Sequence, residues 1–179
     1  MGTSETSTQA QTTMRKGVDM NIALERLAHS DLYLLRTLRN AENDHFFTSS
    51  YITVADQEDW WYRYTKDQHT KFYTIWLNKV TPVGFLSVRL MRDFEIFDVR
   101  EIGHLLLAPA YRGRGIMTQA LTEVRRLYDP LTFWVAHVKA DNEASLALFE
   151  RQDFCKVDLP VKTVKEKKVS NEKAIASRV

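Results

Sequence analysis

The stretch that decides the fold is residues 105–121, LLLAPAYRGRGIMTQAL. Three leucines lead into Ala-Pro-Ala-Tyr, two Arg-Gly pairs follow, and apolar residues then recur at helical spacing. This order predicts a strand, a glycine-rich turn and a helix. A helix begins with four N–H groups that lack intrahelical partners, and with the positive end of its dipole. Glycines let an anion approach those groups and arginines add charge-assisted hydrogen bonds, so the turn favours a pyrophosphate site.

Two common phosphate-binding motifs do not describe this turn. A Walker A loop requires a Gly-Lys pair, which the chain lacks, and a dinucleotide fingerprint requires glycine where Thr118 stands. Considered alone, the turn is explained equally well as an ordinary strand-to-helix connection with solvent-exposed arginines.

Length and composition indicate one soluble globular domain, and the order of its predicted elements, given below, places it in the α/β class. The 179 residues are 44% hydrophobic and 27% charged, and the net charge of +2 gives no reason to expect nucleic acid or a membrane surface as a partner. Cys155 is the only cysteine, which excludes an intrachain disulfide, and the five histidines are widely spaced, so no metal is expected. With no apolar run that would span a bilayer and no signal core, a cytoplasmic location is expected.

The periodicity along the chain predicts three regions. Residues 1–19 are rich in Ser and Thr and are expected to form a disordered tail. Residues 20–161 form the domain, in the order strand, two helices, three strands, helix, strand, helix, strand. Thr53 and Asp56 suit a capping box at the second helix. Residues 162–179 carry many lysines and are expected to be a charged, solvated C-terminal tail.

A second pattern, VKADNEASLALFERQDF at residues 138–154, follows the glycine-rich turn. Together, Arg112-x-x-Gly115 and this segment resemble the acetyl-CoA signature of the GNAT N-acetyltransferase superfamily. The segment GIMTQAL resembles the branch that includes ribosomal-protein N-terminal acetyltransferases. Residues 38–61, LRNAENDHFFTSSYITVADQEDWW, resemble enzymes that acetylate amino sugars on nucleotides. Met117 and Asp153 stand where the family pattern has small residues or glycine.

The resemblance implies a fold and a co-substrate, acetyl-CoA, with no metal. The expected fold is a mixed, mostly antiparallel sheet flanked by helices and splayed at its fourth and fifth strands, with the pantetheine arm between them. The backbone of Leu105, Leu106 and Leu107 would pair with that arm. The turn and helix start would hold the pyrophosphate, through residues Arg112, Gly113, Arg114, Gly115, Ile116, Met117 and Thr118. Asn142 and Ser145 would flank the thioester, although Asn142 also suits a helix N-cap.

Catalysis requires a group that takes the proton of the amine. Glu101 matches the position where several family members keep a carboxylate, and it is equally well explained as a surface acid or salt-bridge partner. Many members supply a tyrosine as the general acid, but Phe149 takes that place here. Ser145, Tyr111 or water remain as proton donors.

The acceptor is expected to be a small-molecule amine, with an amino sugar nucleotide as the first hypothesis. The resemblance points to Arg39, Asn40 and Phe46 as substrate contacts, while a helix C-terminus and the core explain the same residues without a ligand. A protein N-terminal acetyltransferase and a non-catalytic CoA-binding module are the alternatives. The chain is expected to be a monomer or homodimer.

Overall fold

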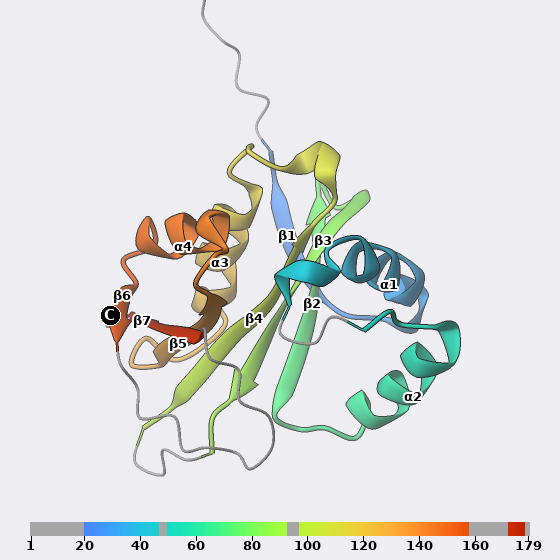
Figure 1. The fold of residues 1–179 in the computed structure, drawn as a ribbon, viewed down its shortest axis with the longest axis horizontal. Helices are drawn as coiled ribbons and strands as arrows, with labels where there is room; N and C mark the ends of the chain where they lie inside the picture. The colour runs from blue at the N-terminus through green and yellow to red at the C-terminus, as the bar shows by residue number, and fades with distance from the viewer. Residues whose placement is uncertain (1–19, 47–49, 93–96, 158–171, 178–179) are drawn as a thin grey trace, which may run out of the picture.

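One mixed sheet organises the part of the chain that the computed structural model describes, residues 20–46, 50–92, 97–157 and 172–177 (Figure 1). Its seven strands stand in the order β1-β2-β3-β4-β5-β7-β6. The strands are β1 (Ile22–Arg26), β2 (Thr70–Leu77), β3 (Thr81–Leu90), β4 (Val99–Leu107), β5 (Phe133–Lys139), β6 (Cys155–Val157) and β7 (Glu172–Ser177). All neighbours pair antiparallel except β4 and β5, which are parallel. The predicted mixed, mostly antiparallel sheet is confirmed.

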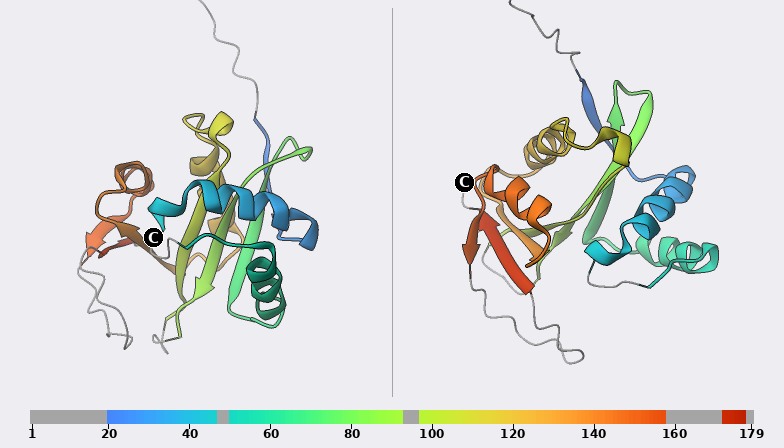
Figure 2. Two further views of the ribbon diagram at one scale, coloured as in Figure 1. Left: turned by 45° about the vertical axis from the view of Figure 1, so that its right-hand side comes forward. Right: turned by 45° about the horizontal axis from the view of Figure 1, so that its top comes forward.

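Helices cover both faces of this sheet, and Figure 2 shows the two layers from the side. On one face lie α1 (Leu32–Ala41) and α2 (Val54–Tyr64), and on the other lie α3 (Ile116–Arg126) and α4 (Glu143–Glu150). Each layer has its own buried cluster. The α1–α2 cluster includes Leu35, Phe72 and Leu106, and the α3–α4 cluster is larger and centres on β2, β3, α3 and β5. No helix in the described part of the chain is long and apolar enough to cross a membrane.

The second helix begins where the sequence predicts. Thr53 Oγ1 accepts a hydrogen bond from Asp56 N, and Asp56 Oδ2 accepts one from Thr53 N at 2.9 Å, which completes the predicted capping box. The residues between α1 and α2 are in turn tied to α1, because the amide of Asn40 bonds both backbone groups of Ile52, each at 2.9 Å.

The sheet opens between β4 and β5. Their pairing covers only Val99–Glu101 against Phe133–Val135, after which the two strands diverge (Figure 1). The second half of β4, including residues 103–107, therefore has no β5 partner along that edge. This confirms the splay expected at the fourth and fifth strands, and it leaves backbone hydrogen-bonding groups facing the gap.

A β-bulge interrupts β4 at the start of this unpaired half. Phe85 of β3 pairs with Leu106 and Ser87 pairs with Gly103, so His104 and Leu105 together lie opposite Leu86 alone. His104 has φ of 49°, in the left-handed region that a strand residue rarely occupies.

Gly84 lies beside this bulge and allows β3 to approach β4 closely. A Cβ atom on Gly84 would lie 2.2 Å from the Leu106 carbonyl oxygen and 2.8 Å from Leu107 Cδ2. We expect Gly84→Ala to lower the free energy of unfolding by roughly 1–3 kcal/mol, as overpacking does elsewhere, in urea denaturation. Gly103→Ala is the matched control, because a Cβ there would meet only Ser87 Oγ, at 3.4 Å. Equal stability of the two variants would contradict this reading of Gly84.

The C-terminal boundary predicted from the sequence requires a correction. Residues 162–179 were expected to be a solvated tail, but residues 172–177 form β7, which pairs with β5 from Trp134↔Ser177 to Lys139↔Glu172. The segment EKAIAS has only three apolar residues beside a run of lysines, so its pattern does not predict a strand. Its position depends on backbone groups of β5 that need partners. The last strand of the predicted element order corresponds to β6, which covers residues 155–157. Residues 158–161 of the predicted domain lie outside the described residues, as does the predicted tail at 1–19.

Candidate active site

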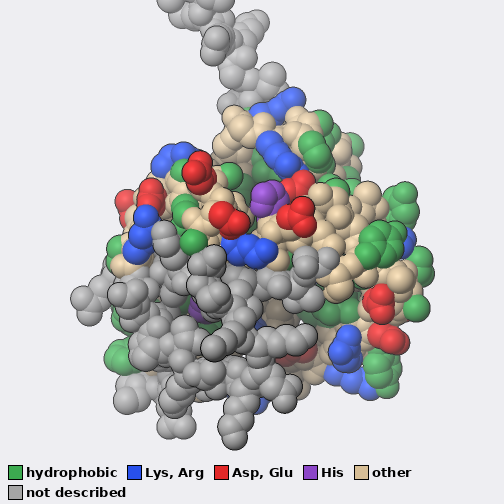
Figure 3. Space-filling model, viewed as in Figure 1, with side chains coloured by type: hydrophobic (Ala, Val, Ile, Leu, Met, Phe, Trp, Pro, Cys, Tyr) green, Lys and Arg blue, Asp and Glu red, His purple; other side chains and the backbone are tan. Residues whose placement is uncertain are grey.

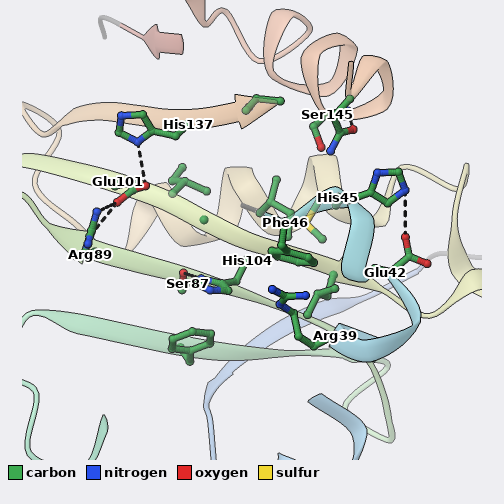
Figure 4. A pocket seen from close by; sticks show the side chains of 18 of the residues that line it. Arg39, Glu42, His45, Phe46, Ser87, Arg89, Glu101, His104, His137 and Ser145 are labelled. Carbon is green, nitrogen blue, oxygen red and sulfur yellow. Dashed lines mark hydrogen bonds and ion pairs between the residues drawn. The ribbon is translucent and has the colours of Figure 1, made fainter. Parts of the chain in front are cut away.

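A cavity of about 810 Å³ runs along β4 and opens at the gap beside β5. Charged side chains and a histidine gather on the surface over the centre of the molecule, between the two helical layers (Figure 3). The end of the cavity toward α3 and α4 is lined by Leu105, Leu107, Met117, Asn142, Ser145 and Phe149. The end toward α1 and α2 is lined by Arg39, Phe46, Trp60, Arg63, Tyr64, Asp67 and Phe72. Glu101 and His104 lie between these ends (Figure 4).

The glycine-rich turn beside this cavity has room for an anion. Gly113 and Gly115 have φ of 70° and 76°, and a Cβ built on either would meet no atom within 4 Å. Gly115 is the N-cap of α3, and no side chain in the described part of the protein caps the helix. The first N–H groups of α3 are therefore available to an acceptor from outside, such as the pyrophosphate that the resemblance implies. The side chains of Ile116 and Met117 are buried and that of Thr118 lines a separate hollow beside β1, so these residues would contribute through their backbone.

The two arginines of the turn have different roles. Arg112 donates to the Leu107 carbonyl oxygen at 3.2 Å and forms an ion pair with Glu42 at 2.6 Å, so it ties the end of β4 to the chain after α1. Arg114 lies over the ring of Tyr111, 5.7 Å from its centroid. Of the pair, Arg114 is better placed to approach a phosphate, because Arg112 would first have to leave Glu42.

The residues expected around the thioester lie together at the α4 end. Leu105, Leu106 and Leu107 form the unpaired edge of β4. Asn142 Oδ1 accepts a hydrogen bond from Ser145 N at 3.1 Å, so Asn142 is the N-cap of α4, the alternative role that its sequence position suggests. Ser145 points into the pocket from α4 (Figure 4). Phe149 is buried and packs on Phe154, with ring centroids 4.9 Å apart, and its ring has no proton to donate.

Glu101 lies at the centre of an ion-pair group that joins three strands. Its Oε2 accepts a hydrogen bond from Arg89 Nε of β3 at 2.8 Å, and its Oε1 lies 3.0 Å from His137 Nδ1 of β5 (Figure 4). Burial by itself would raise the pKa of Glu101, but the hydrogen bond with His137 and the charge of Arg89 outweigh it and hold the pKa below its ordinary value. Because both oxygens are engaged, an incoming proton would have to displace Arg89 or His137.

His104 is the residue of this site that sequence analysis did not single out. Its Nδ1 lies 3.0 Å from Ser87 Oγ, and its ring contacts Phe46 and Phe72 at centroid distances of 5.9 and 5.0 Å. The side chain is exposed to solvent where it lines the open cavity. The protein atoms around the ring still desolvate it, and this desolvation, with the charge of Arg39 in addition, lowers the pKa of His104 to about 4. The imidazole is therefore neutral at neutral pH. Nothing in the sequence EIGHLLL indicates a bulge, so only the structure identifies this position.

The lowered pKa of His104 makes the stability of the folded protein depend on pH in a way that can be measured. The unfolded chain binds a proton at His104 below its ordinary pKa of 6.5, whereas the folded chain does so only near 4. Protonation therefore favours unfolding between these values, and stability falls as the pH falls through this window. We expect the wild type to lose stability relative to His104→Asn as the pH falls from 6.5 to about 4, by urea denaturation. The neighbouring charges Arg39, Arg89 and Glu101 are common to both proteins. Equal losses would show that the pKa of His104 is not lowered.

The acceptor residues expected from the sequence separate in the structure. Arg39 and Phe46 line the cavity, where the guanidinium of Arg39 lies 3.7 Å from the Phe46 ring centroid and donates to Asn43 Oδ1 at 2.8 Å. Asn40 does not line it, because both of its amide groups bond Ile52. The helical period of α1 could have predicted that Arg39 and Asn40 do not share a face, since side chains at consecutive helical positions point about 100° apart.

Fold, site and sequence together establish the class and then the family. The edge of β4 is left open by β5, and the helix beside it begins at a glycine. The sequence resemblance implies both features for an acyltransferase of the N-acetyltransferase type. The model of the Acetyltransferase (GNAT) family matches residues 33–154, and the chain belongs to this family. A search of curated proteins found no match.

Solved structures support the fold. The spermidine N-acetyltransferase from Vibrio cholerae, in complex with CoA and spermine, has a TM-score of 0.73 at 17% identity and covers 88% of this chain and 95% of its own. An acetyltransferase from Thermus thermophilus has a TM-score of 0.71 at 19% identity, covering 88% and 97%. A ribosomal-protein-alanine N-acetyltransferase from Brucella melitensis has a TM-score of 0.64 at 20% identity, and the match covers 88% of this chain and 99% of that one. At these identities the likeness is one of fold.

Proposed function

We propose that the chain transfers the acetyl group of acetyl-CoA to the primary amine of a small polar acceptor that also carries a negative charge. An amino sugar nucleotide is the leading candidate. The observation that carries this proposal is the charge of the described residues that line the cavity, which is net positive. Among them the basic residues are Arg39, Arg63, Arg89, Arg112 and Lys139, and the acidic ones are Glu42, Asp67 and Glu101.

These charges are spread along the cavity. Arg89 pairs with Glu101 and Arg112 pairs with Glu42, while Lys139 donates to a backbone carbonyl near α1. Arg39, Arg63 and Asp67 line the end of the cavity between α1 and α2. Such a site favours a phosphate or carboxylate on the acceptor and disfavours a polycation such as spermidine.

Aromatic side chains make up much of the remaining wall at this end. The rings of Trp60 and Tyr64 are nearly parallel, with centroids 5.1 Å apart, and Phe72 meets Trp60 edge-on at 5.0 Å. A flat apolar wall of this kind suits the face of a sugar ring or a base. Charge and wall together support an acceptor in which a sugar carries both an amine and a phosphate.

At the other end of the cavity the chain would hold acetyl-CoA mainly through its backbone. The unpaired edge of β4 at residues 105–107 would bond the amides of the pantetheine arm, and the first N–H groups of α3 would bond the pyrophosphate. Bound in this way, acetyl-CoA supplies the thioester whose carbonyl the amine attacks. Ser145 of α4 would lie near the thioester end.

A panel of amines tests the acceptor. Thiol release from acetyl-CoA is followed with an amino sugar nucleotide, an amino sugar phosphate, spermidine and a peptide with a free N-terminal alanine, and the products are identified by mass spectrometry. We expect kcat/KM to be highest for the two anionic sugars. A highest value with spermidine or with the peptide would overturn the proposed acceptor and leave the acetyl transfer itself intact.

A further inference from the structure

We infer that His104 contacts the acceptor amine and takes its proton as the amide bond forms, with Ser87 as the positioning residue of the imidazole. This inference rests on the proposed acetyl transfer and adds the residue that handles the proton.

The bulge of β4 turns His104 to the face where the acceptor would bind. In an uninterrupted strand, residues 102 and 104 point to the same face. Ile102 packs in the buried cluster of the α3–α4 face, so regular alternation would bury His104 there too. Instead the ring of His104 contacts Phe46 and Phe72, which belong to the α1–α2 face. The extra residue and the φ of 49° thus bring an imidazole into the cavity. Strained backbone of this kind gathers at functional sites.

Contacts on three sides hold the imidazole in one orientation. Phe46 lies nearly parallel to the ring, with 26° between the planes, and Phe72 contacts it at 47°. Ser87, which is buried, bonds Nδ1 at 3.0 Å. If Nδ1 carries the hydrogen and donates to Ser87 Oγ, the lone pair of Nε2 is the one available to a ligand.

The neighbouring candidates are less suited to take the proton. Both oxygens of Glu101 are engaged, one by Arg89 and the other by His137. Desolvation by the surrounding protein atoms and the charge of Arg39 keep His104 neutral, with a pKa of about 4, so the imidazole needs no prior deprotonation. A base of this low pKa takes the proton once the carbon–nitrogen bond has formed and the amine nitrogen has become acidic, and the imidazolium then passes the proton on readily.

The proposed step balances without any other reactant. The amine nitrogen forms a bond to the acetyl carbonyl carbon, and the carbon–sulfur bond breaks with its electron pair going to sulfur. The proton of the nitrogen moves to Nε2 of His104, and the imidazolium then protonates the CoA thiolate. His104 ends neutral. One residue would thus serve as base and acid, which accounts for a site where Phe149 offers no phenolic proton.

His104→Asn is the first test. Asparagine tolerates a left-handed φ, so the bulge can persist while the basic nitrogen is lost. We expect kcat to fall by about 10²–10⁴-fold, the usual value of general acid–base catalysis, with the acetyl-CoA-induced rise in melting temperature unchanged. His29→Asn is the matched control: His29 is exposed, pairs with Glu58 outside the cavity, and should keep full turnover.

A chemical-rescue experiment separates proton transfer from structure. His104→Gly also suits the positive φ and leaves space where the ring was. Added imidazole should restore part of the turnover, and the rescue should rise with the concentration of neutral imidazole as the pH is raised. Ser87→Ala should lower kcat roughly tenfold with little change in KM, the effect of losing about one hydrogen bond.

Comparison with Glu101→Gln decides between the two proton acceptors. Turnover of His104→Asn equal to that of the wild type, or His104→Gly that is folded and binds acetyl-CoA but gains nothing from imidazole, would overturn the inference. A loss of 10²-fold or more confined to Glu101→Gln would assign the base to Glu101 instead, as the sequence resemblance implies. The proposed function fails in a different way: a wild type that binds acetyl-CoA and acetylates no amine of the panel would remove both.

Discussion

Replacing Gly115 with aspartate will abolish the stabilisation that acetyl-CoA gives to the folded protein. Gly115 is the N-cap of α3, with φ of 76°, and open space lies where a Cβ would point. An aspartate would put a carboxylate where the pyrophosphate is expected to bind, so two anions would compete for the same N–H groups. A ligand present at 100 times its Kd stabilises by about 2.7 kcal/mol, and this gain should disappear from the thermal unfolding curve.

The control for this experiment is Gly115→Asn. Asparagine is close to aspartate in size and accepts a left-handed φ, but it is neutral. We expect the asparagine variant to keep a reduced acetyl-CoA-induced shift. If folded Gly115→Asp shows the same shift as the wild type, the start of α3 does not bind the pyrophosphate.

Reversing the charge of Arg63 will change which amines the enzyme accepts. Arg63 lines the acceptor end of the cavity from α2, and its Nε donates to the Asp59 carbonyl oxygen at 3.3 Å. A hydrogen bond to a charged group contributes about 1.5–3 kcal/mol, so Arg63→Glu should lower kcat/KM for anionic amino sugars by about 10–100-fold. Spermidine should become a better acceptor, because the cavity then carries an additional negative charge.

Arg126→Glu is the control for net charge. Arg126 is exposed at the end of α3, where it pairs with Glu123 away from the cavity. This variant should leave both acceptor preference and kcat/KM unchanged. Unaltered preference in folded Arg63→Glu would show that Arg63 does not contact the acceptor, and the anionic group would then have to be held elsewhere.

Local patterns account for most of the architecture. Apolar spacing predicts the order of all the helices and of every described strand except β7. Thr53 and Asp56 predict the start of α2 because a capping box needs only residues three apart. The two family motifs, Arg112-x-x-Gly115 and residues 138–154, predict the family that the match over residues 33–154 establishes. Such features depend on neighbours along the chain, so they can be recognised before the fold is known.

Other features depend on contacts between distant segments. Arg112 reads as a phosphate ligand in its turn, but in the structure it pairs with Glu42, 70 positions away in the sequence. The sequence leaves Glu101 open as a base, a surface acid or a salt-bridge partner, and the structure shows Arg89 of β3 and His137 of β5 converging on it. Asn40 reads as a substrate contact, but it bonds Ile52. Each of these side chains bonds a partner that is distant in the sequence and comes near only when the chain folds.

The sequence by itself determined the order of the helices and of the described strands up to β6, the glycine-rich turn and the membership of the family, because periodicity and short motifs are local properties. The tertiary structure decided which groups face the cavity and in which protonation state. His104 is the clearest case: strand alternation would bury it beside Ile102, but the register of β3 against β4 inserts one extra residue and turns its ring to Phe46. Its lowered pKa follows from desolvation of the imidazole by the protein atoms around it and from the charge of Arg39. Register, burial and local electric field arise between chain segments, so they are settled only when the segments pack together.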